Sequence, residues 1–329
     1  MLNSTNSTAT QHQGAEVLKA SATSKASAAS EVPSEIREIQ ERLAQALAVF
    51  RGCTVALAFS GGTDSSLLLK LLSQQSQQYG GAVYPLMVST VMHPQGEVAE
   101  AQELCQQLGI ELHTLFLDEL PIIKHNPENR CYLCKHALMS QLKAQAQALG
   151  CSVLLDGTNA DDLKQYRPGI KALQELQIIS PLAQANITKA QVRSMLQALG
   201  LKTARKPSSP CLATRFPYGT TLEKEQLQAI GAAEDALHQL GFYNVRIRAH
   251  PHDQLLRLEL DRDQLGQAIA QREQILTILH QVAGYKYFSL DLEGFHSGSM
   301  DKTLDEQTIA SQKAQQKLNP NPAIQHQEV

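Results

Sequence analysis

The first part of the chain alternates between two patterns of apolar residues. Short apolar runs bounded by polar or turn residues are typical of buried strands, and they lie at 54–60, 82–89, 111–118 and 152–157. Apolar residues at helical spacing follow Ser34 and recur at 65–75, 96–109 and 134–150. Strands that alternate with helices predict an α/β fold, in which a parallel sheet is covered by helices on both faces.

A different pattern follows a segment rich in Pro, Ser and Gly at 207–220. Helices are predicted at 222–240 and 264–282, and strands at 244–250, 254–261 and 285–292. Two adjacent strands followed by a helix and a third strand predict a small C-terminal α+β domain. We therefore expect an α/β domain over 34–206 and an α+β domain over 207–304.

The two ends of the chain have another composition. Residues 1–33 and 305–329 are rich in small and polar residues, which predicts a disordered leader and a disordered tail. The leader lacks the apolar core of a secretory signal, and no apolar run approaches the roughly 18 residues of a membrane helix. We expect a cytoplasmic protein with no membrane partner.

Charge and cysteine content narrow the function further. Lysine and arginine number 29 and aspartate and glutamate 32, so the formal net charge of −3 argues against a nucleic-acid partner. In a reducing cytoplasm, the six cysteines favour metal binding or catalysis over disulfides.

The segment FSGGTDSS, residues 59–66, joins a predicted strand to a predicted helix. Its glycines let backbone N–H groups form a concave turn, and the helix N-terminus adds partial positive charge, so the turn suits a phosphate. The serines supply hydroxyl donors, and the aspartate either caps the helix or faces Mg²⁺. A plain glycine turn before a helix is the alternative. The predicted ligands are Ser60, Gly61, Gly62, Asp64, Ser65 and Ser66.

Two other phosphate-binding motifs are absent from the sequence. There is no G-x-x-x-x-G-K-[ST], and no G-x-G-x-x-G follows a predicted strand. Residues 59–66 instead resemble the SGGxDS motif of the PP-loop ATP pyrophosphatases. In that family the loop holds the pyrophosphate of ATP while a substrate oxygen attacks the α-phosphorus. The resemblance implies adenylation with ATP and Mg²⁺, in which Asp64 is catalytic and positioning and charge neutralisation lower the barrier.

Three cysteines form a second candidate site. Cys131 and Cys134 make a C-x-x-C pair, and Cys211 lies in the distant segment SPCLATRFPYG. Three thiolates suit an iron–sulfur cluster with one open iron, or a zinc ion that lacks a fourth protein ligand. A redox pair and small buried side chains are the alternatives. The other three cysteines, which lie in or beside apolar segments, are expected to be structural: Cys53, Cys105 and Cys151.

Several charged residues suit an anionic ligand. Arg246 and Arg248 are two positions apart, so they share one face of a predicted strand and could bind a phosphate or carboxylate. Arginines on a solvated strand face are the alternative. Arg167, in a Pro-Gly turn, is a candidate for neutralising pyrophosphate.

Three carboxylates follow the predicted strand at 152–157. Asp156, Asp161 and Asp162 lie where open α/β sheets bind their ligands. They suit Mg²⁺ or a nucleotide, and an ordinary polar loop is the alternative.

Five segments together carry a sharper resemblance, at 58–66, 156–172, 209–222, 245–250 and 290–301. Over about residues 34–304 the chain resembles the ATP-dependent sacrificial sulfur transferases of the LarE type. The resemblance implies adenylation of a carboxylate of pyridinium-3,5-biscarboxylic acid mononucleotide. Sulfur insertion then gives a thiocarboxylate in nickel-pincer nucleotide cofactor biosynthesis. It also implies a homo-oligomer, and it places Arg246 and Arg248 near the substrate phosphate.

The family contains two kinds of sulfur donor. In single-cysteine members the cysteine at the position of Cys211 gives up its sulfur and becomes dehydroalanine. In three-cysteine members a [4Fe-4S] cluster carries an extra sulfide, and Cys131, Cys134 and Cys211 match its ligands. We expect the cluster type here, and we expect Arg215 or Lys135 to lower the pKa of the Cys211 thiol.

Three other functions compete with this one. A PP-loop tRNA thiolase uses a similar loop and similar cysteines, but the net charge argues against it. An amide-forming PP-loop synthetase leaves Cys211 without a role. A module that senses ATP without turnover would bind ATP and release no pyrophosphate.

Overall fold

The computed structural model describes residues 33–92, 96–164, 167–206, 210–296 and 299–300. Apart from Pro33, the predicted leader and tail lie outside the described residues, as does the predicted domain end at 304. Among the helices described, none has the length and apolar character that crossing a bilayer requires.

The first part of the chain forms a four-stranded sheet in which every strand pair is parallel. The strands are β1 (Thr54–Ala58), β2 (Ala82–Ser89), β3 (His113–Phe116) and β4 (Val153–Leu155), in the order β3-β2-β1-β4. The helices around it are α1 (Ser34–Leu47), α2 (Thr63–Tyr79), α3 (Glu97–Gln107), α4 (Leu120–Ile123), α5 (Arg130–Ala148), α6 (Gly169–Glu175), α7 (Pro181–Gln184) and α8 (Lys189–Ala198).

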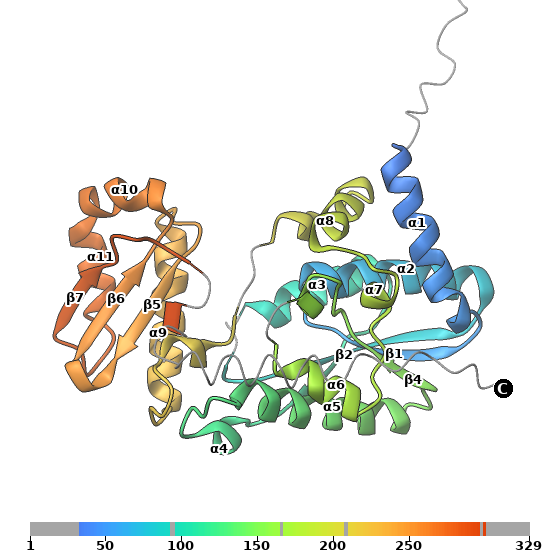
Figure 1. The fold of residues 1–329 in the computed structure, drawn as a ribbon, viewed down its shortest axis with the longest axis horizontal. Helices are drawn as coiled ribbons and strands as arrows, with labels where there is room; N and C mark the ends of the chain where they lie inside the picture. Colours follow the sequence, from blue (N-terminus) through green and yellow to red (C-terminus); the bar gives the residue numbers. More distant parts are fainter. Residues whose placement is uncertain (1–32, 93–95, 165–166, 207–209, 297–298, 301–329) are drawn as a thin grey trace, which may run out of the picture.

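Both faces of this sheet are buried under helices. Along β1, Val55 and Leu57 pack into a core with side chains of α1, α2 and α8, whereas Ala56 faces a second core with α5 and α6. Figure 1 shows α2 and α8 on one side of the sheet and α5 and α6 on the other. Apolar residues therefore occupy both sides of a strand, as in other parallel sheets. The predicted α/β fold is confirmed.

The order of the strands places a ligand site at one edge of the sheet. The chain leaves β1 through α2 to β2 on one side, and it returns after α5 to β4 on the other side of β1. Open α/β sheets bind ligands at the carboxyl ends of the strands where the order reverses. The segments after β1 and after β4 meet at that point.

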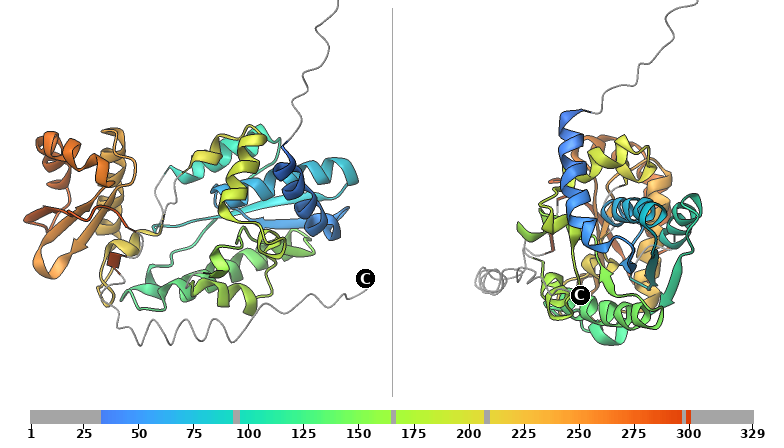
Figure 2. Two further views of the ribbon diagram at one scale, coloured as in Figure 1. Left: turned by 45° about the horizontal axis from the view of Figure 1, so that its top comes forward. Right: turned by 90° about the vertical axis from the view of Figure 1, so that its right-hand side faces the viewer.

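The second part of the chain forms a separate three-stranded sheet with the order β5-β6-β7. Strands β5 (Arg246–His250) and β6 (Leu255–Glu259) are antiparallel, and β7 (Tyr287–Leu290) is parallel to β6. The left view of Figure 2 shows this sheet standing apart from the first one. Helices α9 (Lys224–Gln239), α10 (Leu265–Ala270) and α11 (Arg272–Leu279) belong to it, so the predicted α+β arrangement is confirmed.

One predicted helix is wrong in its length. The helix expected at 264–282 is divided into α10 and α11 at Gln271, whose φ of −100° and ψ of 16° lie outside the helical region. Ala268 on α10 and Ile275 on α11 are both buried in the core.

The second core includes residues from the first part of the chain. Met92, which follows β2, and Ile123 of α4 are buried together with α9 and the three strands. The division of the chain near residue 206 therefore remains a prediction, because the packing crosses it.

Candidate active site

The loop between β1 and α2 is held in a concave form by its own hydrogen bonds. The Ser60 and Ser65 hydroxyls lie 3.2 Å apart, the Gly62 N–H donates to Ser60 Oγ, and Ser65 Oγ donates to the Gly62 carbonyl. Gly61 has a φ of 65°, and a Cβ there would lie 3.2 Å from the Ala101 Cβ. Both the backbone conformation and the contact with α3 therefore favour glycine.

A cavity of about 360 Å³ opens beside this loop, and we call it the loop cavity. Its polar wall includes Ser60, Asp64 and Ser65, and its apolar wall includes Leu86 and Met139. A cavity with one polar and one apolar wall suits a nucleotide. Ser66 does not line it: its side chain is fully buried, so nothing in the geometry supports the hydroxyl donor predicted there.

The segment after β4 forms the opposite side of the loop cavity. A Cβ at Gly157 would lie 3.0 Å from the Ser65 backbone nitrogen, so glycine allows the two segments to approach. Asp156 is buried and accepts a hydrogen bond from Thr158 Oγ1 at 2.8 Å. It is also 3.5 Å from the Lys135 ammonium. Asp156 therefore fixes this turn.

Two other predicted residues, Asp162 and Arg167, lie on the same side of the loop cavity. Asp162 pairs with Arg167 at 2.9 Å, and burial raises the pKa of the Asp162 carboxyl. Asp161 is held by the backbone N–H of Lys189 at 2.9 Å, and this bond lowers its pKa. Both Asp162 and Arg167 line the loop cavity, whereas Asp161 does not.

Asp64 is paired with a lysine that the sequence analysis missed. Its Oδ2 is in contact with the Lys189 ammonium, and its Oδ1 accepts from Asn159 Nδ2 at 3.2 Å. The Lys189 ammonium also contacts the Thr63 hydroxyl.

The position of Lys189 is unusual for a cation, because it is the first residue of α8 and the helix dipole disfavours positive charge there. Thr188 and Gln191 form a capping box that fixes this helix start. The pattern T-x-x-Q before an apolar run was the available signal in the sequence.

The three predicted cysteines lie in one neighbourhood. Cys131 and Cys134 lie in the first turns of α5, and Cys211 precedes the 3₁₀ turn η4 (Leu212–Arg215). Burial, with a smaller effect from neighbouring thiols, raises the pKa of the Cys134 thiol to about 12 and that of Cys211 to about 11. Within the described part of the chain, no three Cys, His, Asp or Glu side chains are close enough to share a metal ion. The thiols are neighbours without forming an assembled ligand set.

The prediction for the activation of Cys211 is wrong. Arg130, not Arg215 or Lys135, is the cation that lowers the pKa of the Cys211 thiol, although burial has the larger and opposite effect. Arg215 instead forms two bonds of 2.8 and 2.6 Å to the Glu234 carboxylate, and Lys135 faces Asp156.

A buried asparagine joins the segments that carry these cysteines. Asn126 lies between α4 and α5, has a φ of 45° and is fully buried. Its side-chain amide donates to the carbonyls of Ala213, Phe216 and Pro217 at 3.4, 3.1 and 2.8 Å. No local pattern predicts these three hydrogen bonds, because the partners are 87 to 91 residues away in the chain.

The two predicted arginines have different surroundings. Arg248 is buried and donates from Nε and Nη2 to the fully buried Glu259 at 3.0 and 2.9 Å, and from Nη1 to the Thr214 carbonyl. Arg246 is also buried, and burial together with the nearby charge of Arg215 lowers its pKa to about 10. Arg246 lines a cavity and Arg248 does not.

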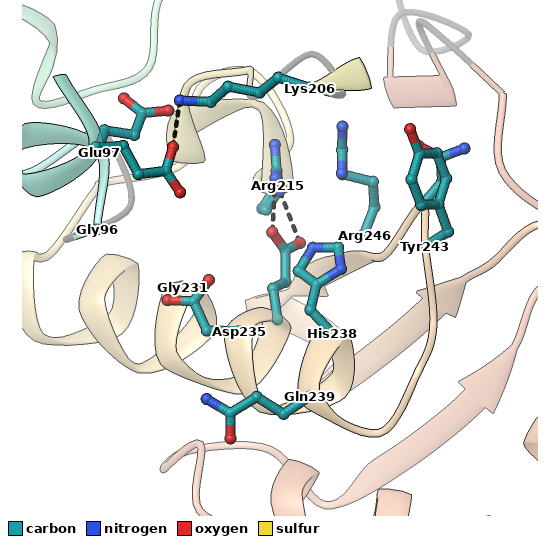
Figure 3. A pocket seen from close by; sticks show the side chains of 13 residues that line it. Gly96, Glu97, Lys206, Arg215, Gly231, Asp235, His238, Gln239, Tyr243 and Arg246 are labelled. Atoms are coloured by element: carbon teal, nitrogen blue, oxygen red, sulfur yellow. Dashed lines mark hydrogen bonds and ion pairs between the residues drawn. The ribbon is translucent and has the colours of Figure 1, made fainter. Parts of the chain in front are cut away.

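That cavity, of about 410 Å³, lies between the two parts of the chain, and we call it the inter-unit cavity. Residues from α3, α9 and β5 line it, together with Lys206 and Arg215. In Figure 3, Glu97 and Lys206 lie at one end, and Arg246 and Tyr243 lie at the other. The Arg215–Glu234 pair lies between these ends.

The first strand of the parallel sheet runs through S-G-G-T-D-S into a helix, and a nucleotide-sized cavity lies beside this loop where the strand order reverses. These features together define a PP-loop ATP pyrophosphatase. The family model for asparagine synthase, which belongs to this superfamily, matches residues 38–252.

Two curated relatives cover most of the chain. Pyridinium-3,5-bisthiocarboxylic acid mononucleotide synthase of Lactiplantibacillus plantarum is 35% identical over 259 residues, which are 78% of this chain and 92% of the relative. An uncharacterized protein of Synechocystis sp. is 41% identical over 253 residues, 75% of this chain and 92% of the relative. A tRNA-specific 2-thiouridylase of Trichlorobacter lovleyi is 26% identical and covers 53% of this chain. The chain therefore belongs to the LarE-type family of ATP-dependent sulfur transferases, as predicted.

Proposed function

We propose that this protein is an ATP-dependent sulfurtransferase that adenylates a carboxylate of pyridinium-3,5-biscarboxylic acid mononucleotide and replaces one carboxylate oxygen by sulfur, in nickel-pincer nucleotide cofactor biosynthesis. The observation that carries this proposal is the match to the synthase of L. plantarum over 92% of that protein, including both parts of this chain. The preformed loop and the neighbouring thiols supply the two chemical functions that such a reaction needs.

The reaction has two steps. In the first, a carboxylate oxygen of the acceptor attacks the α-phosphorus of ATP, and the bond to the bridging oxygen breaks, so that pyrophosphate leaves. In the second, a sulfur nucleophile attacks the carbonyl carbon of the acyl adenylate, and AMP leaves with the bonding electron pair. Neither step needs an oxidant, because sulfur enters at the sulfide level.

The loop residues stabilise the leaving pyrophosphate in this proposal. The hydroxyls of Ser60 and Ser65, which line the loop cavity, and the backbone N–H groups of Gly61 and Gly62 hold its oxygens. This requires that the Gly62 N–H and the Ser65 hydroxyl exchange their partners within the loop for phosphate oxygens. Asp64 holds Mg²⁺, which requires that its carboxylate exchange the Lys189 ammonium for the metal ion. Because the concave form of the loop exists before ATP binds, little movement of the backbone accompanies the charge that develops on pyrophosphate.

Cys131, Cys134 and Cys211 are the proposed ligands of a [4Fe-4S] cluster. The donor set fits such a cluster in its chemistry, because three thiols from two segments are close enough for Cys131 to affect the pKa of both Cys134 and Cys211, which pack against an apolar core. The raised pKa values of Cys134 and Cys211 mean that these two thiols stay protonated at neutral pH until a cation binds them. When bound, the cluster would supply an iron with a free position for sulfide.

Acceptor-dependent release of pyrophosphate is the test of the proposed function. We expect release with ATP and the biscarboxylate nucleotide, together with a product in which mass spectrometry finds sulfur in place of oxygen. Asp64→Ala should lower the rate by about 100-fold or more. ATP binding without release with any acceptor would contradict the proposal and favour a sensor, and release only with tRNA would favour a thiolase.

The source of the sulfur needs a separate measurement. Anaerobic reconstitution with iron and sulfide should give the broad visible absorbance of a cluster, and Cys131→Ala should lose it. If the protein instead stays colourless and Cys211 loses the mass of hydrogen sulfide after one turnover, the cluster is excluded and the sacrificial route is supported.

Cytoplasmic location and a homo-oligomer are part of the same proposal. The family resemblance supports the oligomer, and light scattering of the purified protein measures it. A monomer at micromolar concentration would contradict it.

A further inference from the structure

The inter-unit cavity and the loop cavity are neighbours. Glu97, the first residue of α3, lines both of them. Gly61 of the loop packs against Ala101 one turn further along the same helix. A molecule in the inter-unit cavity therefore lies next to the loop that is proposed to hold ATP.

Lys206 connects the two cavities chemically. Its ammonium lies 3.3 Å from the Gly61 carbonyl and 2.6 Å from Glu100 Oε2, and its side chain also lines the inter-unit cavity. The lysine is mostly buried, with 19% of its side chain exposed, whereas its partner Glu100 is 61% exposed. An exposed partner is held weakly, because water competes for it. Lys206 can therefore exchange Glu100 for an anionic ligand.

The geometry of the adenylation step determines where such a ligand must lie. A carboxylate oxygen attacks the α-phosphorus only from about 3 to 3.5 Å, so the acceptor carboxylate has to reach the mouth of the loop cavity. Two anions, the carboxylate and the phosphate chain, then approach each other and need a cation between them. Among the residues that line the inter-unit cavity, Lys206 is the cation with a contact to the loop.

We propose that the inter-unit cavity binds the acceptor and that Lys206 leaves Glu100 to hold the reacting carboxylate against the loop. This inference rests on the proposed function and deepens it, because it names the residue that positions the reacting carboxylate of the acceptor. The acceptor phosphate, which the family resemblance places near Arg246 and Arg248, then lies toward Arg246, away from the Lys206 ammonium in Figure 3. At that end Arg246 adds a further cation to the Arg215–Glu234 and Arg248–Glu259 ion pairs.

The acidic residues of the cavity do not oppose this arrangement. Glu234 is neutralised by its two bonds to Arg215, and Glu100 turns toward solvent when Lys206 leaves it. Asp235 has a raised pKa because of burial, so its charge is disfavoured. Glu97 remains, at the boundary between the two cavities.

The test compares two ligands that differ only at the ring substituent. Nicotinate mononucleotide carries the carboxylate, and nicotinamide mononucleotide carries an uncharged amide in its place. Binding to the full-length protein is measured by calorimetry without ATP. We expect the wild-type protein to prefer the carboxylate ligand by about 10- to 100-fold, the range of a charged hydrogen bond. Lys206→Met should remove this preference and leave the affinity for the amide ligand within about two-fold.

Two variants serve as controls. Lys202→Met changes an exposed lysine that does not line the inter-unit cavity, and it should keep the preference. Glu100→Gln removes the competing carboxylate, and it should strengthen binding of nicotinate mononucleotide several-fold without changing binding of the amide.

Three outcomes would overturn the inference. These are an unchanged preference in Lys206→Met, a loss of ATP affinity without a loss of preference, and wild-type protein that binds neither mononucleotide. Pyrophosphate release from ATP and the biscarboxylate acceptor is measured in parallel. If release is normal while the preference is unaffected by Lys206→Met, only the placement of the carboxylate fails. If release is absent from the wild-type protein, the proposed function fails.

Discussion

Lys189 shows how a single residue can serve two states of a site. Its ammonium contacts both Thr63 and Asp64 across a separation of about 125 residues in the chain. It does so from the first turn of a helix, where the dipole disfavours a cation. The ion pair with Asp64 offsets this cost. In the proposed mechanism Mg²⁺ would take the carboxylate, and the same ammonium would then be free to bind pyrophosphate.

Replacing this lysine should have opposite effects on metal and nucleotide. In Lys189→Met the carboxylate of Asp64 loses its competitor, so Mn²⁺ binding without ATP, measured by electron paramagnetic resonance, should become several-fold tighter. Pyrophosphate release should fall by about 10- to 100-fold, because a charged hydrogen bond to the leaving group is lost. Lys164→Met, at an exposed lysine paired with Asp161, should change neither. Weaker Mn²⁺ binding in Lys189→Met would show that the lysine only supports the fold.

Cys105 makes the stability of the folded protein depend on pH, and the direction of this dependence follows from the burial of its thiol. The side chain is buried in the core beside α2, as predicted for this cysteine, and burial raises its pKa from 9.0 to about 11. The thiol therefore stays protonated in the folded protein at pH values where the unfolded chain ionises. Its contribution to stability is present below pH 9 and is lost as the pH rises toward 11.

The variant Cys105→Ala isolates this effect. Its free energy of unfolding should be lower than that of the wild type at pH 7, because a cavity forms, and the difference should shrink between pH 9 and 11. Urea denaturation at each pH measures it. A difference that stays constant or grows over this range would contradict the buried, protonated thiol.

At the scale of elements, hydrophobic periodicity was sufficient for the first sheet and for α1, α2, α3, α5 and α9, whereas α4, α6, α7 and α8 were not predicted and the chain around α6 to α8 was expected to be mostly loop. β2 covers 82–89 as predicted, and α3 falls within two residues of its predicted range, whereas α2 ends at Tyr79 instead of 75 and α5 begins at Arg130 instead of 134. The short helices α4 and α7 have four residues each, too few for a periodic pattern. They form because the chain around them is packed, which is not a local property.

The candidate site was predictable where it is local in sequence and not where it is built from distant segments. The loop at 59–66 carries its own glycines and helix start, so the motif could be read directly. Lys189, Lys206 and Asn126 act on partners about 90 to 145 residues away. The error at Arg215 has the same cause, because the partner that occupies it, Glu234, lies on α9.

Asn126 belongs to this scale because it fixes one element against another. Its amide holds the turn around η4, which follows Cys211, against the start of α5, which carries Cys131 and Cys134. Asn126→Asp keeps the shape but places carboxylate oxygens against three carbonyls. We expect it to slow cross-linking of Cys211 to Cys134 by dibromobimane, measured by fluorescence, by about 10-fold or more, the range of a lost hydrogen bond and an unpaired buried charge.

Two further variants distinguish the effect of the Asn126 side-chain amide from the effect of its backbone conformation. Asn126→Gly keeps access to the φ of 45° but lacks the donors, so it should also slow the cross-link. Asn186→Asp, at an exposed asparagine with a φ of 52°, should not. Rapid cross-linking in both Asn126 variants would mean that the cysteines are placed by other contacts.

For the whole molecule, the shared core decides whether the two parts of the chain unfold together. Met92 comes from the first part and is fully buried in the core of the second, where its carbonyl also accepts from the Leu212 N–H at 2.8 Å. A core that both parts complete couples their stability. The acceptor site proposed between them requires this coupling, since a loose junction would not hold the carboxylate at attacking distance.

Because the chain has no tryptophan, each part can carry its own fluorescent reporter at an exposed tyrosine, Tyr79→Trp for the first and Tyr287→Trp for the second. In urea the two reporters should give one midpoint. Met92→Ala should destabilise the protein by about 2–5 kcal/mol and do so at least as strongly at the second reporter as at the first. Met139→Ala, a buried methionine of α5 in the first part, should act mainly at the first reporter. If Met92→Ala shifts only the first reporter, the two parts fold independently, and a rigid acceptor site between them is excluded.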